Sequence, residues 1–157
     1  MTAHVIDRAQ AGRRTHTWKS ARSLGRAAAD IASARDIDEL AFAVRANLPA
    51  LGIRRCFVLE WCGLSGGARL ARLALVQEPA GRTATTKSQA TCLASEILRQ
   101  HVLPVMGEHA FAILPMTFDR KDLGLLVLEL GATDDYLYET LREVFSAVRA
   151  RGQSPAD

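Results

Sequence analysis

The chain has 157 residues, of which 48% are hydrophobic and 24% charged, so it can bury the core of one domain. Its net charge of +3 comes mostly from arginines spread along the sequence, which favours a solvated surface over direct nucleic-acid binding. No apolar run is long enough to cross a membrane, and no apolar segment follows the N-terminal charges as it would in a signal peptide. We therefore expect a cytoplasmic protein with no membrane contact.

The three cysteines, Cys56, Cys62 and Cys92, lack the paired spacing of a zinc site. A cytoplasmic location predicts that their thiols are reduced. The sequence predicts no metal site and identifies no cofactor. Residues 1–16 have no periodicity and are expected to form a flexible leader, residues 17–151 one domain, and residues 152–157 a disordered tail.

Two helices are predicted before the first strand. The first covers residues 17–34 and carries a stripe formed by Trp18, Ala21, Gly25 and Ala28. Small residues allow another helix to approach closely, and that helix could belong to the same chain or to a second copy. The second helix is predicted to begin at Asp36, which would form a capping box with Glu39. Its exit is marked by Pro49 and Gly52.

Alternating apolar residues predict strands over residues 53–61 and 68–77, joined by a turn with the sequence CGLSGG. The first strand has two faces: one carries Phe57, Leu59 and Trp61, and the other carries Cys56, Val58 and Glu60. Residues 79–90 are polar and predict a long loop, which in a compact domain is often a lid or a binding loop. A short helix is expected over residues 91–102.

A second hairpin is predicted from strands over residues 111–118 and 123–130, with the turn at residues 119–122. The last helix is expected to begin near Asp134, and its apolar positions have the spacing of a coiled-coil seam: Leu137, Leu141, Val144 and Val148. Together these elements predict an α+β fold. An antiparallel sheet would carry the N- and C-terminal helices on one face and the loops and short helix over the other.

Three segments resemble the GAF domain family, in particular a subgroup from bacterial signalling and transcription-regulator proteins. LPALGIRRCFVLEW is similar to the helix exit and first strand of that subgroup, and ILPMTFDRKDLGLLVLELG to its late hairpin. DDYLYETLREVFSAVRA resembles its closing helix, where a Tyr-Glu-x-Leu-Arg run is typical. The resemblance covers residues 18–150. It implies a regulatory or sensory module that often dimerises through its terminal helices and can enclose a small molecule over one sheet face.

The chain lacks the Asn-Lys-Phe-Asp-Glu signature of the cyclic-nucleotide-binding members of this family, so the resemblance does not imply that ligand. Nor does the sequence contain a nucleophile triad, a paired-carboxylate motif or a phosphate-binding loop, and we expect no catalytic residue. The candidate ligand-binding residues lie on the first strand, near the loop and on the second hairpin: Cys56, Val58, Glu60, Cys92, His109 and Glu129.

Three functions follow as hypotheses. The first is a non-catalytic sensor that binds an unidentified small molecule. The second is a ligand-free interaction module, with a homodimer interface formed by Trp18, Ala21, Gly25 and Ala28 together with the seam from Leu137 to Val148. The third is a thiol-based redox enzyme, which depends only on the three cysteines, with Cys92 as its best candidate for a reactive thiol.

Overall fold

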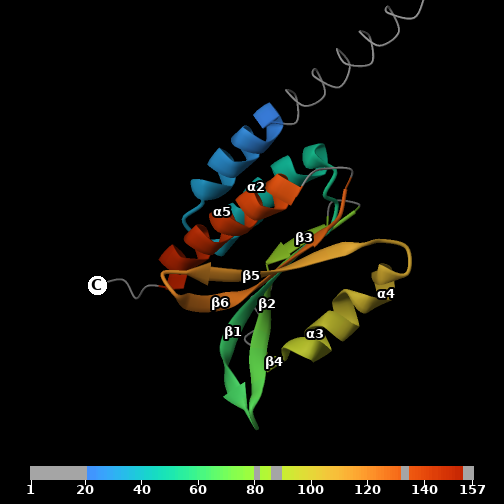
Figure 1. Ribbon diagram of the computed structural model, residues 1–157, viewed down its shortest axis with the longest axis vertical. Coiled ribbons are helices and arrows are strands. Elements are labelled where there is room, and N and C mark those ends of the chain that lie inside the picture. Colours follow the sequence, from blue (N-terminus) through green and yellow to red (C-terminus); the bar gives the residue numbers. More distant parts are fainter. Residues whose placement is uncertain (1–20, 80–81, 86–89, 132–134, 154–157) are drawn as a thin grey trace, which may run out of the picture.

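The computed structural model describes residues 21–79, 82–85, 90–131 and 135–153 and has an α+β fold (Figure 1). The predicted leader, Trp18 and most of the predicted tail lie outside these residues. A first helix covers residues 21–32. The elements that follow it are, in chain order, α2 (Ile37–Asn47), the 3-10 helix η1 (Leu48–Leu51), β1 (Cys56–Ser65), β2 (Ala68–Glu78), β3 (Arg82–Thr85), β4 (Cys92–Leu93), α3 (Ala94–His101), α4 (Leu103–Met106), β5 (Phe111–Phe118), β6 (Lys121–Glu129) and α5 (Asp135–Gln153).

The strands form one antiparallel sheet in the order β3-β2-β1-β6-β5, and β4 also pairs with β2. The antiparallel sheet and the two predicted hairpins, β1–β2 and β5–β6, are therefore confirmed. The structure corrects the prediction at two places. Residues 62–65, predicted as part of a turn, continue β1 and leave only Gly66 and Gly67 between the strands. The predicted long loop contains β3, and β4 follows it.

Local chemistry explains several element boundaries. Asp36 caps α2 by accepting a hydrogen bond from the backbone N of Glu39 at 2.8 Å, as predicted. The Glu39 carboxylate accepts from the backbone N of Arg35 rather than from that of Asp36, so the capping box is shifted by one residue. Asp119 and Arg120 have φ values of 48° and 62°, and two consecutive positive φ values give the tight turn of the β5–β6 hairpin.

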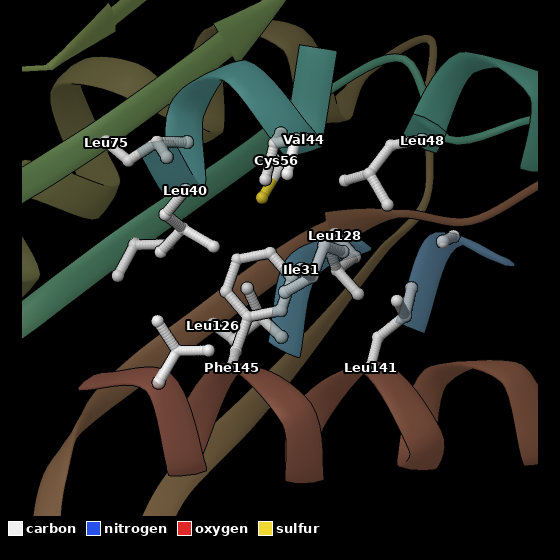
Figure 2. Close-up of a cluster of buried hydrophobic side chains, with 14 of the residues drawn as sticks. Ile31, Leu40, Val44, Leu48, Cys56, Leu75, Leu126, Leu128, Leu141 and Phe145 are labelled. Carbon is white, nitrogen blue, oxygen red and sulfur yellow. The ribbon is translucent and has the colours of Figure 1, made fainter. Parts of the chain in front are cut away.

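The first helix, α2 and α5 lie together on one face of the sheet (Figure 1). Here α5 packs on β5 and β6, and α2 packs on β2 and β3. Figure 2 shows the resulting core, in which Phe145 and Leu141 of α5 meet Ile31 of the first helix and Leu128 of β6. Each of these four side chains is fully buried. We call this side of the sheet the helix face.

The helix face also accounts for the predicted seam of the last helix. Leu137, Leu141 and Val148 are buried in the chain's own core, and Val144 packs against it. This corrects the expectation that they form an interface with a second copy, because their apolar surface is already covered within one chain. No described helix is both long and apolar enough to cross a membrane.

Candidate functional site

The opposite side of the sheet, which we call the α3 face, has a second and smaller apolar cluster. Its buried members come from three strands, from α3 and from the residue that follows it: Phe57, Leu59, Ala71, Ile97, Val102 and Val127. Half-buried side chains, including Trp61, Phe111 and Leu125, surround them. Because side chains alternate along a strand, β1 contributes Phe57 and Leu59 to this face and the residues between them to the helix face.

The cover of the α3 face is incomplete. The helix α3 packs on β2, and Figure 1 shows α3 and α4 on the side of the sheet away from α2 and α5. Every residue of α4 is at least partly exposed. On the outer strand β5, Ile113 lies directly across from Val127 and is 46% exposed. One end of this apolar face is thus open to solvent, while the helix face is sealed by three helices.

A polar cluster borders this open end. Glu129, at the end of β6, is two residues beyond Val127 and directly across from Phe111, which places its side chain on the α3 face. Its Oε1 accepts a hydrogen bond from Arg55 at 3.2 Å, and Nδ1 of His109 lies 2.9 Å from the same oxygen, within ion-pair distance. Its backbone N also donates to the carbonyl oxygen of Arg55. We call Arg55, His109 and Glu129 the Glu129 cluster.

The two oxygens of the Glu129 carboxylate are in different states. The side chain is only 7% exposed, and Oε1 accepts from Arg55 and lies within ion-pair distance of His109. Oε2 is buried and has no hydrogen-bond partner among the described residues. A buried carboxylate oxygen without a donor is destabilising, so the ion pairs of Glu129 with Arg55 and His109 have to offset this cost.

The other end of the α3 face carries an exposed cluster. Trp61 donates from Nε1 to Asp122 at 2.9 Å, and Arg69 pairs with the same carboxylate. The Arg69 guanidinium lies over the Trp61 ring, 4.9 Å from its centroid. The indole ring and the Asp122 carboxylate therefore both hold the Arg69 guanidinium in place at this end of the face.

The structure brings some of the predicted site residues together and separates others. Glu129 and His109 are in contact, and Cys92 packs against the same apolar cluster. Cys56 and Val58 are fully buried in the core of the helix face (Figure 2 labels Cys56), so the prediction that they lie under the loop and short helix is corrected. A molecule on the α3 face would meet Phe57 and Leu59 in their place.

Glu60 also lies on the helix face, where it is 1% exposed. It accepts a hydrogen bond at 2.8 Å from Nε of Arg72 on β2 and forms an ion pair with Arg149 of α5. The contact between Arg72 and Glu60 raises the pKa of Arg72, first through their hydrogen bond and second through the negative charge of the Glu60 carboxylate. Glu60 is thus committed to holding α5 on the sheet and is not available to a ligand on the α3 face.

The geometry gives thiol chemistry little support at Cys56. Burial raises the pKa of its thiol, which disfavours the reactive thiolate. Cys62 is exposed and Cys92 is half-buried. Among the described residues, no group of three or more His, Cys, Asp or Glu side chains could hold a metal ion.

The chain matches no protein-family model, and no curated protein or solved structure matches it significantly. A function must therefore be inferred from the chain's own geometry.

The pairing of Arg55 with Glu129 was not predicted, although the position of Arg55 just before β1 places it across from the end of β6. Phe57, Leu59 and Trp61 were predicted to share one face of the strand but were not assigned to the binding side.

Proposed function

We propose that this chain is a non-catalytic regulatory domain of the GAF-like type, which binds a small molecule on the α3 face and acts in signal transduction or transcription regulation. The unequal cover of the two sheet faces supports this function most directly. Three helices seal one apolar face, whereas the other is open beside Ile113 and is bordered by the buried, charge-paired Glu129. Binding sites for small molecules commonly combine an apolar surface with a few fixed polar groups.

Binding would act on the rest of the domain through the central strand β1. Leu59 faces the binding side, and the next residue, Glu60, holds Arg149 of α5. A ligand that binds one arrangement of β1 better than another would shift the population of α5 positions. The output would then pass to a partner or to another part of a longer protein.

Native mass spectrometry of the purified chain tests this proposal. We expect a mass above that of the 157-residue chain, from a non-covalently bound molecule that leaves when the collision energy is raised. Extraction and accurate mass measurement would then give the composition of that molecule. A chain that carries no additional mass, even when purified directly from its host's lysate at low salt, would contradict a bound small molecule.

The alternative is a ligand-free dimerisation module, and one observation favours it. The predicted stripe on the first helix faces away from the core, which this helix enters instead through Leu24, Ala27 and Ile31. Ala21 and Gly25 are exposed and Ala28 is half-buried, so a second helix could approach closely there. Substituting Leu141 would not test this surface, because Leu141 is fully buried in the core.

For the dimer alternative we expect Gly25→Glu to convert a dimer to a monomer without loss of the fold. A Cβ added at Gly25 would meet nothing within 4 Å, so the glutamate enters solvent in the monomer and would be buried in a dimer. Light scattering gives the mass and circular dichroism the helix content. An unchanged dimeric mass for Gly25→Glu would show that this stripe is not the interface.

A further inference from the structure

We propose that the outer edge of β5 pairs with the same edge of a second copy of this chain, in an antiparallel register centred on Ala112. This inference goes beyond the proposed function, since it needs no ligand, and it concerns a different surface from the stripe on the first helix. Three observations carry it: the free backbone groups of β5, the position of Pro115 within the strand, and the exposed side chain of Ile113.

One side of β5 has backbone groups without a strand beside them. β5 is the last strand in the sheet order, and in the described part of the chain no strand pairs with it on the side away from β6. The backbone N of Leu130 donates to the carbonyl oxygen of Ala110, so Ala110 faces β6. Along an antiparallel strand, successive residues point their N–H and C=O groups to opposite sides. Those of Phe111 and Ile113 therefore point outward, where another strand can reach them.

Pro115 divides this outer edge into two halves. By the same alternation Pro115 points outward as well, and because it has no N–H it cannot take a full part in a second ladder. Proline and charged residues are common means by which an edge strand avoids pairing with other chains. The segment Phe111–Leu114 has the sequence FAIL and contains neither, so this half of the edge is unprotected. A partner strand is thus directed to Phe111–Leu114.

This segment is complementary to itself when two copies meet about a two-fold axis at Ala112. Phe111 of each copy then lies opposite Ile113 of the other, and each of these pairs can exchange two hydrogen bonds because both residues have an N–H. Aromatic and β-branched residues also form a favourable cross-strand pair. A register centred one residue further along, on Ile113, would instead set Pro115 opposite Phe111, and one hydrogen bond of each such pair would be lost.

The side chains beside this edge supply apolar surface for the contact. Ile113 is 46% exposed although it lies on the α3 face, directly across from the buried Val127. In the pair, Phe111 of the second copy would cover Ile113 and remove part of this surface from water. On the helix face, the residue at the axis is Ala112, whose side chain is small. The contact uses the same surface on both copies and closes after two, so neither copy keeps this edge free.

Cysteine cross-linking tests the register directly. In the proposed pair, Ala112 lies opposite its own copy at a position without hydrogen bonds, where Cα atoms are about 4.5 Å apart and a disulfide can form. We expect Ala112→Cys to oxidise to a covalent dimer of twice the 17.1 kDa chain mass, in a background where Cys62 and Cys92 are replaced by serine. Cys56 is fully buried and stays in place.

Leu114→Cys in the same background is the matched control. Leu114 and Ala112 are both partly buried against the core of the helix face, so the two cysteines would have similar surroundings in one chain. In the proposed register the two copies of position 114 are four residues apart along the paired strands, about 13 Å, which is too far for a disulfide. We expect this variant to stay monomeric on non-reducing gels. Oxidation in urea, where the chain is unfolded, should give equal and small amounts of dimer for both variants.

Light scattering on the unmodified chain decides the inference even if a cysteine variant does not fold. We expect a dimer, and Ile113→Pro should convert it to a monomer with unchanged circular dichroism, because the N–H that this variant lacks points away from β6. A monomeric wild-type chain, even at its highest soluble concentration, would overturn the inference. So would cross-linking of Leu114→Cys in place of Ala112→Cys, or a dimer that Gly25→Glu dissociates and Ile113→Pro does not. The proposed binding of a small molecule would stand in each of these cases, because native mass spectrometry tests it separately.

Discussion

Replacing Gly124 with alanine is expected to destabilise the protein by about 4 kcal/mol or more, which is a large fraction of the roughly 5–15 kcal/mol that stabilises a typical domain. Gly124 of β6 pairs with Glu60 of the central strand β1, and it has a φ of 156°. A Cβ added there would lie 1.9 Å from the carbonyl oxygen of Leu59 and 2.9 Å from its carbonyl carbon. The atoms in conflict are backbone atoms, so no side-chain rotation can relieve the contact.

The position of Gly124 explains why the effect should be large. β1 is the central strand of the sheet and β6 is an inner strand beside it, and both apolar clusters depend on their pairing. Moving β6 away from β1 would disturb Leu126 on the helix face and Leu125 on the α3 face together. An adjustment that relieved the contact would therefore loosen two packed layers, and neither can be repacked without the other.

Urea unfolding followed by circular dichroism would measure this effect. Gly107→Ala is the matched control, because Gly107 has a φ of −65° and no atom within 4 Å of an added Cβ. That variant should change the free energy of unfolding by less than about 1 kcal/mol. A Gly124→Ala protein whose unfolding midpoint stays close to that of Gly107→Ala would show that β6 does not approach β1 as closely as the structure has it.

The sequence was sufficient to predict most elements because local chemistry sets their limits. The Asp36 cap, the helix exit at Gly52 and the strand Phe111–Phe118 were all predicted where the structure has them. The left-handed φ of 79° at Gly52 is the structural reason for that exit. The short strands β3 and β4 were not predicted. β3 lies in a polar segment without alternation and β4 has only two residues, so neither has a strand pattern of its own, and both become strands by pairing with the free edge of β2.

The sequence also did not show which residues of β1 face the proposed binding side, the α3 face. In a central strand that is buried on both sides, both sets of alternating residues are apolar. Phe57 and Leu59 differ little in character from Cys56 and Val58, so the alternation separates two faces without showing which one the three helices cover. The packing of α5 decides it, and the relevant contact, between Arg149 and Glu60, joins residues far apart in the chain.

The ion pair between Arg149 and Glu60 leads to the second prediction of a large loss of stability. We expect Arg149→Met to destabilise the protein by about 3–5 kcal/mol, because it leaves the Glu60 carboxylate buried with one of its two cationic partners removed. Glu60 is 1% exposed and Arg149 6% exposed, so water cannot replace the guanidinium. Arg72 still donates to Oε2 at 2.8 Å, but Oε1 would then lack a cation. Methionine keeps most of the apolar stem, so the loss reports on the charge.

Arg142→Met is the matched control on the same helix. Arg142 pairs with Glu139 at the surface of α5, where both partners reach solvent, and such pairs contribute little. Only the variant at Arg149 should therefore lower the unfolding midpoint strongly. If the unfolding midpoints of the two variants fell by equal and small amounts, Glu60 would not depend on Arg149 for compensation of its charge.

A double variant would separate the cost of an unpaired charge from the value of the pair. Arg149→Met is expected to lower the stability because it leaves a buried carboxylate without charge compensation. If so, adding Glu60→Leu should recover part of the lost stability, since the carboxylate is then removed from the core. Arg72 would lose its partner as well, but its side chain is 43% exposed and can be solvated. A double variant as unstable as the sum of the two single variants would instead show that each residue acts through its own packing. In that case α5 would be held on the sheet by the apolar contacts of Leu141 and Phe145, and a shift in β1 would reach the helix through them.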